Sequence, residues 1–210
     1  MDLSLIETLR WEPGTGFLRL ERHLTRLAHS ASVFGLNGAE EARQALLTAL
    51  AAPALPGISP LRIRLELFAD GRIDVQTAPF TPLAPDAIWR LKIARTRLSS
   101  VDPLLRHKTS RRAAYAAARA EFPTETADEV LLLNEHDMLC EGTITSLFLD
   151  DGTGILKTPP LACGLLAGVL RQELLESGKA AEQILRPEDF GEGTVFVGNS
   201  LRGLIRATLS

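Results

Sequence analysis

The sequence predicts a mixed α/β (α+β) fold of two domains, on three observations. Segments with an apolar residue at every second position occur beside segments with helical spacing. The 210 residues fit one large domain or two small ones, and 45% of them are hydrophobic, which is enough for a core. The segment from Pro79 to Pro85 holds three prolines and is typical of a linker. We therefore expect a small domain over 1–80, a linker over 81–86 and a larger domain over 87–210.

The N-terminal part predicts two strands, two helices and a hairpin, in that order. LSLIETLRW and GFLRLERHL are typical of short strands around a Pro-Gly turn. Helical spacing of apolar residues predicts a helix over ERHLTRLAHSASVFG, which Gly35 ends, and a second over AEEARQALLTALAA, which ends near Pro53. The alternating pattern of LRIRLELFADGRIDVQTAPF about Asp70-Gly71 indicates a β-hairpin.

The C-terminal part alternates between strands and helices. WRLKIAR predicts a strand, and residues 109–121 predict a helix. DEVLLLNEHDMLCEGTITSLFLDDG predicts two strands joined by a turn over 134–137. AGVLRQELLESG predicts a helix with Gly178 at its C-terminal cap. GTVFVGNSLRGLIRATL predicts strand residues on either side of a turn at 198–200.

Composition excludes several classes of function. The net charge is −3 with both signs interspersed, so we expect no nucleic-acid partner. Two cysteines are too few for a disulfide scaffold, which favours a reducing, cytoplasmic location. The N-terminus lacks the cationic start of a signal peptide, and no apolar run is long enough to span a membrane. The four histidines have no neighbours at metal-ligand spacing, so we expect no metal site.

A single lysine leads the alanine-rich segment LLRHKTSRRAAYAAARAE, which begins at Leu104. The chain has only four lysines among its 23 lysine and arginine residues, so arginine is its usual cation. Arginine cannot lose its proton, whereas a buried lysine can, and its neutral amine is a nucleophile. Lys108 is therefore a candidate for covalent chemistry or, alternatively, a solvated charge at the start of a helix.

Four other features each allow a functional and a structural interpretation. Glu141 lies in the apolar segment MLCEGTITSLF, where a carboxylate either faces solvent or is buried with a partner. Glycines precede the helix in ACGLLAGVLRQELLESG, where backbone N–H groups either cradle a phosphate or only lead into the helix. The turn at 198–200 either donates to an anion or only reverses the chain. Arg26 follows Arg22 by one helical turn, where a solvated arginine is the default.

Taken in order and at their spacing, these segments resemble the class IV aminotransferase family of pyridoxal-phosphate enzymes. The family includes branched-chain aminotransferases, D-amino-acid aminotransferases and 4-amino-4-deoxychorismate lyases. The resemblance rests on an H-x-x-R-L motif from His23 to Leu27 and on the segments DPLLRHKTSRRAAYAAARA, ADEVLLLNEHDMLCEGTITSLF, CGLLAGVLRQELLE and FVGNSLRGLI. It implies a two-domain D-amino-acid aminotransferase-like fold. The residues around Lys108 and the segment N-S-L-R-G are most similar to the lyase branch of the family.

The resemblance implies pyridoxal 5′-phosphate as the cofactor, an electron sink that the protein binds, orients and tunes. Lys108 is expected to bond covalently to the cofactor aldehyde and later to act as a general acid and base. Glu141 is expected to keep the pyridine nitrogen protonated, and Arg26 to bind the phosphate through two N–H groups. The other expected phosphate contacts, at a helix start and a nearby turn, are Gly168, Val169, Leu170, Asn199 and Ser200.

The activity that the resemblance implies is a lyase reaction on a small-molecule amine. A lyase of this branch eliminates pyruvate from 4-amino-4-deoxychorismate and leaves 4-aminobenzoate, a folate precursor. A D-amino-acid or branched-chain transaminase is the alternative with the same cofactor site. A non-catalytic cofactor-binding relative is a third. The family also implies a homodimer.

The sequence departs from the family pattern in three places. The N-terminal strand is shortened, without the usual Y-G-D-G lead-in, and Ile6 stands where phenylalanine is usual, which affects a wall of the substrate pocket. Ser146 replaces the asparagine of E-G-x-x-x-N-L-F, which alters hydrogen bonding around the site. The tyrosine that some members place near the cofactor has no certain counterpart, since Tyr115 lies on the helix after Lys108. These departures bear on the substrate more than on the cofactor.

Overall fold

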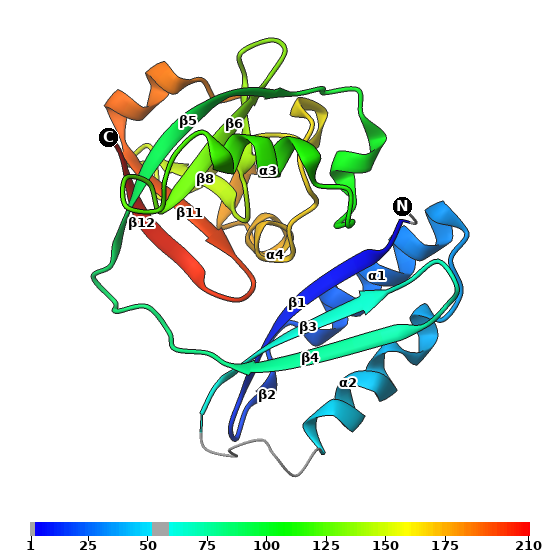
Figure 1. Cartoon of the computed structure of the whole chain (residues 1–210). Coiled ribbons are helices and arrows are strands. Elements are labelled where there is room, and N and C mark those ends of the chain that lie inside the picture. The colour runs from blue at the N-terminus through cyan, green and yellow to red at the C-terminus, as the bar shows by residue number, and fades with distance from the viewer. Residues whose placement is uncertain (1–2, 52–58) are drawn as a thin grey trace. The chain divides into compact units, whose positions relative to one another are not determined.

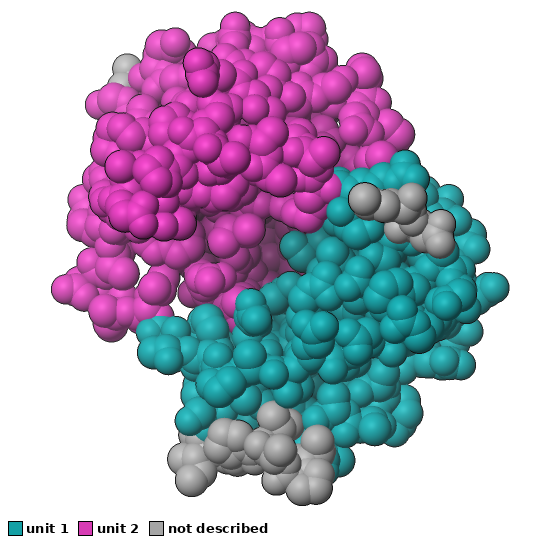
Figure 2. Space-filling model, in the orientation of Figure 1, with its two compact units in different colours: residues 1–82, 107–111 teal, residues 83–106, 112–210 magenta. Residues whose placement is uncertain are grey.

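The computed structural model describes residues 3–51 and 59–210 (Figure 1). The chain forms two compact units, and Figure 2 shows them in different colours. Their residues are 1–82 with 107–111 for unit 1 and 83–106 with 112–210 for unit 2. The predicted end of the second helix near Pro53 lies outside the described residues.

The boundary between the units differs from the predicted one in a single segment. The chain leaves unit 1 after Pro82, inside the segment predicted as a linker, but residues 107–111 return to it. The sequence analysis placed Lys108 in the C-terminal domain, whereas it packs with unit 1. The reason is a backbone interaction with the first strand, which local sequence patterns do not reveal.

Unit 1 is an antiparallel sheet in the order β2-β1-β3-β4 with two helices (Figure 1). Alternation in the strands points one set of side chains into a core, where Leu9 and Ile63 meet Leu27 and Leu46 of the helices. Burial of each such side chain stabilises the fold by about 1.5–3 kcal/mol. The elements are β1 (Leu5–Glu12), β2 (Gly16–Phe17), α1 (Leu20–Phe34), α2 (Ala42–Leu50), β3 (Leu61–Leu67) and β4 (Ile73–Pro79).

Two local predictions for unit 1 are confirmed. Helix α1 ends at Gly35, whose φ of 66° is left-handed and therefore favours glycine. The β-hairpin forms with Leu67 opposite Ile73, and Gly71 in its turn has a φ of 84°. Both features depend on a few neighbouring residues, so the sequence pattern was sufficient to find them.

Unit 2 is a mixed sheet in the order β10-β9-β8-β11-β12-β5-β6-β7. Strand β8 also pairs with β7, which closes the path through β11, β12, β5 and β6 into a ring. Strand β5 runs parallel to β12 and β6, in agreement with the predicted mixed class. The strands are β5 (Ile88–Leu98), β6 (Glu129–Asn134), β7 (Leu139–Gly142), β8 (Ser146–Asp150), β9 (Leu156–Thr158), β10 (Ala180–Glu182), β11 (Thr194–Asn199) and β12 (Gly203–Leu209).

The helices of unit 2 pack on this sheet through two separate clusters. Helix α3 (Ala113–Ala120) buries Tyr115 and Ala118 against β6. Helix α4 (Val169–Glu176) buries Leu170 and Leu174 with Phe148 of β8. Among the described residues, no helix is long and apolar enough to cross a membrane.

Two predictions for unit 2 need correction. The helix predicted over 109–121 begins only at Ala113, because the residues before it pair with the first strand. The segment predicted as two strands forms three, β6, β7 and β8, because a second tight turn occurs where the N–H of Gly142 donates to the carbonyl of Thr145 at 2.8 Å. That turn contains neither proline nor an Asn-Gly pair, so it carries no strong local signal.

Candidate active site

Lys108 is anchored by its backbone to strand β1. The N–H of Ile6 donates to the carbonyl of Lys108 at 2.8 Å, and Ser110 donates to the carbonyl of Ser4 at 3.0 Å. Thr109, between them, forms a β-bridge with Leu5 and is buried. The side chain of Lys108 itself is half-buried. The lysine therefore lies beside an isolated β-bridge to strand β1, in place of the expected helix start.

His107 fixes the same segment against helix α1. Its Nδ1 lies 2.9 Å from the hydroxyl of Ser30. Its ring meets the edge of Phe34 with 4.8 Å between centroids, and it stacks on His29 at 5.7 Å. Side-chain and backbone contacts thus restrain both sides of the peptide that carries Lys108.

Arg26 lies in a buried ion-pair network with Glu7 and His23. Its Nε donates to Glu7 Oε1 at 2.8 Å and its Nη2 to Glu7 Oε2 at 2.6 Å, a two-pronged contact. His23 Nδ1 lies 2.6 Å from Glu7 Oε2. Because Glu7 directly follows Ile6 in β1, the strand that holds the backbone of Lys108 also holds the partner of Arg26.

The charge of Glu7 is secured by these neighbours. Burial acts to raise the pKa of its carboxyl, but the charges and hydrogen bonds of Arg26 and His23 outweigh burial and lower the pKa to about 2. A guanidinium has five N–H donors, and Glu7 uses two of those of Arg26. The arrangement orients the arginine.

Glu141 lies on β7 and is only 4% exposed, which settles its two interpretations in favour of the buried one. Its Oε1 accepts a hydrogen bond from the Tyr115 hydroxyl at 2.6 Å and another from the N–H of Leu166 at 3.0 Å. Burial, followed by the Glu141 charge, raises the pKa of Tyr115 above its ordinary value, so the phenol keeps its proton and donates. The sequence analysis missed this role of Tyr115.

Arg112 connects Tyr115 to the turn after Glu141. Its guanidinium lies over the Tyr115 ring, 4.1 Å from the centroid, and its Nη2 donates to the carbonyl of Thr143. This contact, together with the burial of the ring, fixes the phenol relative to β7. Its sequence signal is weak, because Arg112 and Thr143 are 31 residues apart.

Glu129, at the start of β6, shapes the turn from Thr143 to Thr145. Its Oε1 accepts from the Thr143 N–H at 3.0 Å and hydroxyl at 2.6 Å, and its Oε2 from the Ile144 N–H at 3.1 Å and the Thr145 hydroxyl at 2.8 Å. Asn199 donates from Nδ2 to the Ile144 carbonyl at 3.1 Å. The turn is thus tied to two neighbouring strands, and Glu129 is a second structural residue that the sequence analysis missed.

The start of helix α4 is the segment that the sequence analysis predicted to bind a phosphate. Gly168 is its N-cap, and the first intrahelical bond runs from Gln172 N–H to the Gly168 carbonyl at 2.9 Å. The first N–H groups of a helix, here those of Val169 and Leu170, have no acceptor within the helix. A Cβ at position 168 would lie 2.5 Å from the Ser146 hydroxyl oxygen, so this close approach favours glycine. The predicted helix start is confirmed, and its role toward a phosphate stays a prediction.

The turn after β11 lies beside this helix start. Asn199 Oδ1 accepts from the N–H groups of Leu201 at 3.1 Å and Arg202 at 2.9 Å, so its side chain shapes the turn. Ser200 is buried. The register places Ser146 opposite both Glu141 and Gly198, on three neighbouring strands. Unit 2 thus gathers Glu141, the helix start and the Asn199–Ser200 turn, whereas Lys108 and Arg26 belong to unit 1.

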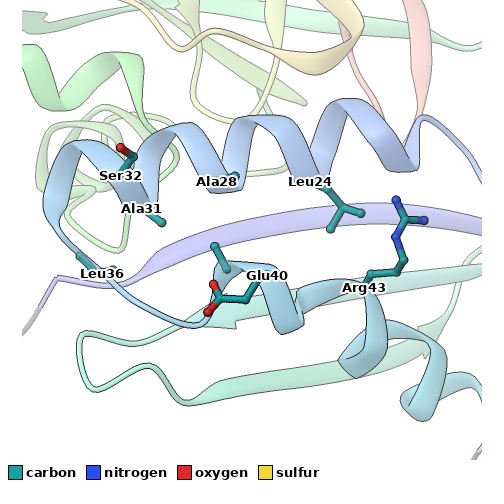
Figure 3. Close-up of a pocket in the computed structure, with 8 residues that line it drawn as sticks. Leu24, Ala28, Ala31, Ser32, Leu36, Glu40 and Arg43 are labelled. Carbon is teal, nitrogen blue, oxygen red and sulfur yellow. The ribbon is translucent and has the colours of Figure 1, made fainter.

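A pocket of about 410 Å³ lies elsewhere on unit 1, between helix α1 and the segment that leads into α2 (Figure 3). Its lining contains none of the predicted site residues and is largely apolar. The lining residues are Leu24, Ala28, Ala31, Ser32, Leu36, Ala39, Glu40 and Arg43.

Comparison with known proteins places this geometry in a family. The model of the class IV aminotransferases matches residues 4–209. A Schizosaccharomyces pombe protein provisionally named aminodeoxychorismate lyase is 30% identical over 99% of this chain and 90% of its own length. The crystal structure of a provisionally named amino-acid aminotransferase from Mesorhizobium loti is 50% identical, with a TM-score of 0.94 over 100% of both chains.

The 4-amino-4-deoxychorismate lyase of Pseudomonas aeruginosa is a more distant structural relative. It is 27% identical, with a TM-score of 0.80 over 98% of this chain and 82% of its own. Lyases and aminotransferases of this group share one fold and use pyridoxal phosphate. The chain therefore belongs to the class IV aminotransferases, pyridoxal-phosphate enzymes that act as lyases or aminotransferases.

Proposed function

We propose that the protein is a lyase that eliminates pyruvate from 4-amino-4-deoxychorismate and releases 4-aminobenzoate. The observation that carries this choice is the similarity to the Schizosaccharomyces pombe relative, which spans 99% of the chain. The resemblance of the segments around Lys108 and Asn199 to the lyase branch supports the same choice.

The residues present fit pyridoxal phosphate. The cofactor supplies an electron sink when bound, which requires a primary amine, an anion opposite its ring nitrogen and a phosphate site. A half-buried lysine, a buried carboxylate held by hydrogen-bond donors, and an open helix start match these three needs. We assign them to Lys108, Glu141 and the N–H groups that follow Gly168.

In this proposal Lys108 has two tasks. Its amine would hold the cofactor covalently and, once free, would move a proton at the reacting carbon. The β-bridge at Thr109 and the Ile6 hydrogen bond restrain the backbone, so the side chain pivots from a fixed point. Glu141, as an anion, keeps the proton on the ring nitrogen, which lets negative charge spread into the ring.

We propose that one phosphate is bound by six of the predicted residues. Arg26 contributes its positive charge, and the helix dipole adds to the attraction at the start of α4. Because the amide of Asn199 already bonds to the Ile144 carbonyl and to its own turn, we expect that residue to act through its backbone. The set is Arg26, Gly168, Val169, Leu170, Asn199 and Ser200.

The test is product formation by protein reconstituted with pyridoxal phosphate. We expect a visible absorption band from the lysine-bound cofactor and release of 4-aminobenzoate and pyruvate in equal amounts from aminodeoxychorismate. Lys108→Arg keeps the charge without the nucleophilic amine, so it should lose both the band and the product. Wild-type protein that shows the band but makes no 4-aminobenzoate would overturn the lyase assignment.

A transaminase is the second candidate, favoured by the name of the Mesorhizobium loti relative at 50% identity. A D-amino or branched-chain amino acid would then bleach the visible band, and a keto acid would restore it. The lyase proposal expects the band to persist with these donors. Measurement of the spectrum with each donor separates the two functions before any lyase substrate is prepared.

The expected setting is a cytoplasmic homodimer. The family supports the dimer, and the two buried free cysteines support a reducing compartment. Light scattering of the purified holoenzyme tests the first expectation, since a monomeric mass at micromolar concentration contradicts it.

A further inference from the structure

We propose that Tyr115 is a positioning residue, which holds the Glu141 carboxylate in one orientation and favours its ionised form. The inference rests on the proposed function only where it concerns the cofactor, because Glu141 is the residue assigned to the ring nitrogen. The hydrogen bond between Tyr115 and Glu141 involves only protein groups, so it can be measured without cofactor.

The geometry of the carboxylate carries the proposal. Two donors, the Tyr115 hydroxyl at 2.6 Å and the Leu166 N–H at 3.0 Å, converge on one oxygen, Oε1. Both must be broken for the carboxylate to turn about its last bond. The other oxygen of Glu141, Oε2, therefore keeps a fixed direction. A carboxylate that must face the ring nitrogen of a bound cofactor requires such a fixed orientation.

Tyr115 is itself rigid enough to serve as a reference point. It is 7% exposed and packs in the core cluster of α3 and β6. Arg112 covers the ring and bonds to Thr143, two residues beyond Glu141. The phenol is thus fixed by packing from one side and by a cation from another, so its hydroxyl cannot follow a moving carboxylate.

Most of the effects on the titratable groups around this pair act in one direction. Burial first, and then the Glu141 charge, raises the pKa of Tyr115, while Arg112 opposes this effect without cancelling it. Burial first, and then Glu141, raises the pKa of the Cys140 thiol on the same strand. Phenol and thiol therefore stay neutral at physiological pH, and Glu141 remains the anion of the cluster.

Removal of the hydroxyl should make Glu141 a stronger base. A hydrogen bond to a buried carboxylate favours the ionised form, so Tyr115→Phe should move the protonation of Glu141 to higher pH. The phenyl ring keeps its volume, so packing around α3 is preserved. The expected signature is a shift of the acid limb of activity toward higher pH, which a purely structural role would not produce.

The first experiment uses the protein without cofactor. Tyr115 is the only tyrosine of the chain, so carbon-13-labelled tyrosine gives a single hydroxyl-bearing ring carbon signal in NMR. Glu141→Gln replaces the charged acceptor with a neutral one, and we expect that signal to move. A signal that is unchanged in Glu141→Gln would overturn the inference, whatever cofactor the protein binds.

The second experiment is a double-mutant cycle on the holoenzyme with Tyr115→Phe, Glu141→Gln and both together. Tyr115→Phe should lower kcat about tenfold at neutral pH, the equivalent of one charged hydrogen bond. If Tyr115 acts through Glu141, the same change should have little further effect in Glu141→Gln. Effects that multiply would overturn the inference.

Failure of the proposed function would give a different experimental result from failure of this inference. Wild-type protein without a visible cofactor band would remove the role toward the ring nitrogen, while the NMR comparison would still decide whether Tyr115 and Glu141 are coupled. A thermal melt of each variant completes the set. A Tyr115→Phe melt equal to wild type, with a shifted pH profile, is the expected combination.

Discussion

The two units each bury a carboxylate, and they hold it in opposite ways. Glu7 of unit 1 is bound by the cation Arg26 and by His23, which lie within 2.8 Å of its oxygens. Glu141 of unit 2 is bound by neutral donors, a phenol and a backbone N–H. Neutral donors stabilise a negative charge without cancelling it, whereas a bidentate arginine neutralises it. This difference supports the proposal that Glu7 orients Arg26 and that Glu141 faces the cofactor ring.

The largest expected effect comes from the lysine. Lys108→Ala should lower turnover by about 10⁴-fold or more, because it removes both the covalent anchor and the proton carrier. Stability should change little, since the backbone bonds of residues 107–111 do not need the side chain. Steady-state kinetics and a thermal melt measure the two quantities.

A matched control is Lys179→Ala, which removes an exposed lysine from unit 2. It should leave turnover and melting temperature at the wild-type values. Comparable activity losses in both variants would contradict the assignment of Lys108.

The second largest expected effect tests the difference between Glu141 and Glu7. Glu141→Gln should lower turnover by about 10²- to 10³-fold, because an amide cannot hold a proton on the ring nitrogen by charge. The amide oxygen still accepts hydrogen bonds from Tyr115 and Leu166, so the melting temperature should stay near wild type. A variant that unfolds but keeps its specific activity per folded molecule would reverse the roles given to the two carboxylates.

Local sequence patterns predicted most helices and strands, but they did not predict the contacts that hold the site residues in place. The α1 helix with Gly35 and the Asp70-Gly71 hairpin depend on neighbours in sequence, so periodicity and turn chemistry found them. The bond between Tyr115 and Glu141 joins residues 26 apart. Nothing within a window of a few residues distinguishes such a tyrosine from any core aromatic.

The same limit explains the corrections to the predicted elements. The helix expected from residue 109 begins at Ala113, because the peptide around Thr109 pairs with Leu5, more than a hundred residues earlier in the chain. The extra turn before β8 exists because Glu129 binds it from another strand. The resemblance to a family named Lys108 and Glu141 as site residues, but it gave no account of what holds them.

Glu7→Gln should mainly lower the stability of the fold, whereas Glu141→Gln should mainly lower turnover. The pKa of Glu7 falls from 4.5 to about 2 on folding, so its ionisation stabilises the fold above pH 4.5. That contribution, about 3 kcal/mol at neutral pH, disappears as the pH falls through 4.5 toward 2. The free energy of unfolding of Glu7→Gln should therefore be lower at pH 7 and flatter over that range.

Denaturant titrations of cofactor-free protein at several pH values measure this profile. Glu12→Gln is a suitable control, because that glutamate lies at the end of the same strand and is less buried. Parallel pH curves for Glu7→Gln and wild type would show that Glu7 contributes no linked charge, and the comparison of the carboxylates would fail.

The smallest expected effect tests the open helix start of unit 2. The backbone at Gly168 has φ −66° and ψ 135°, which alanine also adopts, so any penalty must come from the new Cβ. That Cβ would lie 2.5 Å from the Ser146 hydroxyl oxygen, and overpacking of this kind costs about 1–3 kcal/mol. Gly168→Ala should therefore weaken cofactor binding about tenfold, a loss within the energy of that strain.

Adding Ser146→Ala to Gly168→Ala should restore cofactor binding. With the hydroxyl gone, the nearest atom of residue 146 is its Cβ at 3.9 Å, an ordinary contact. The double variant should recover much of the cofactor affinity, as measured by titration of the visible band, and Gly191→Ala, where nothing lies within 4 Å, should not change it. Without rescue, the requirement for glycine must lie in access to the backbone N–H groups themselves.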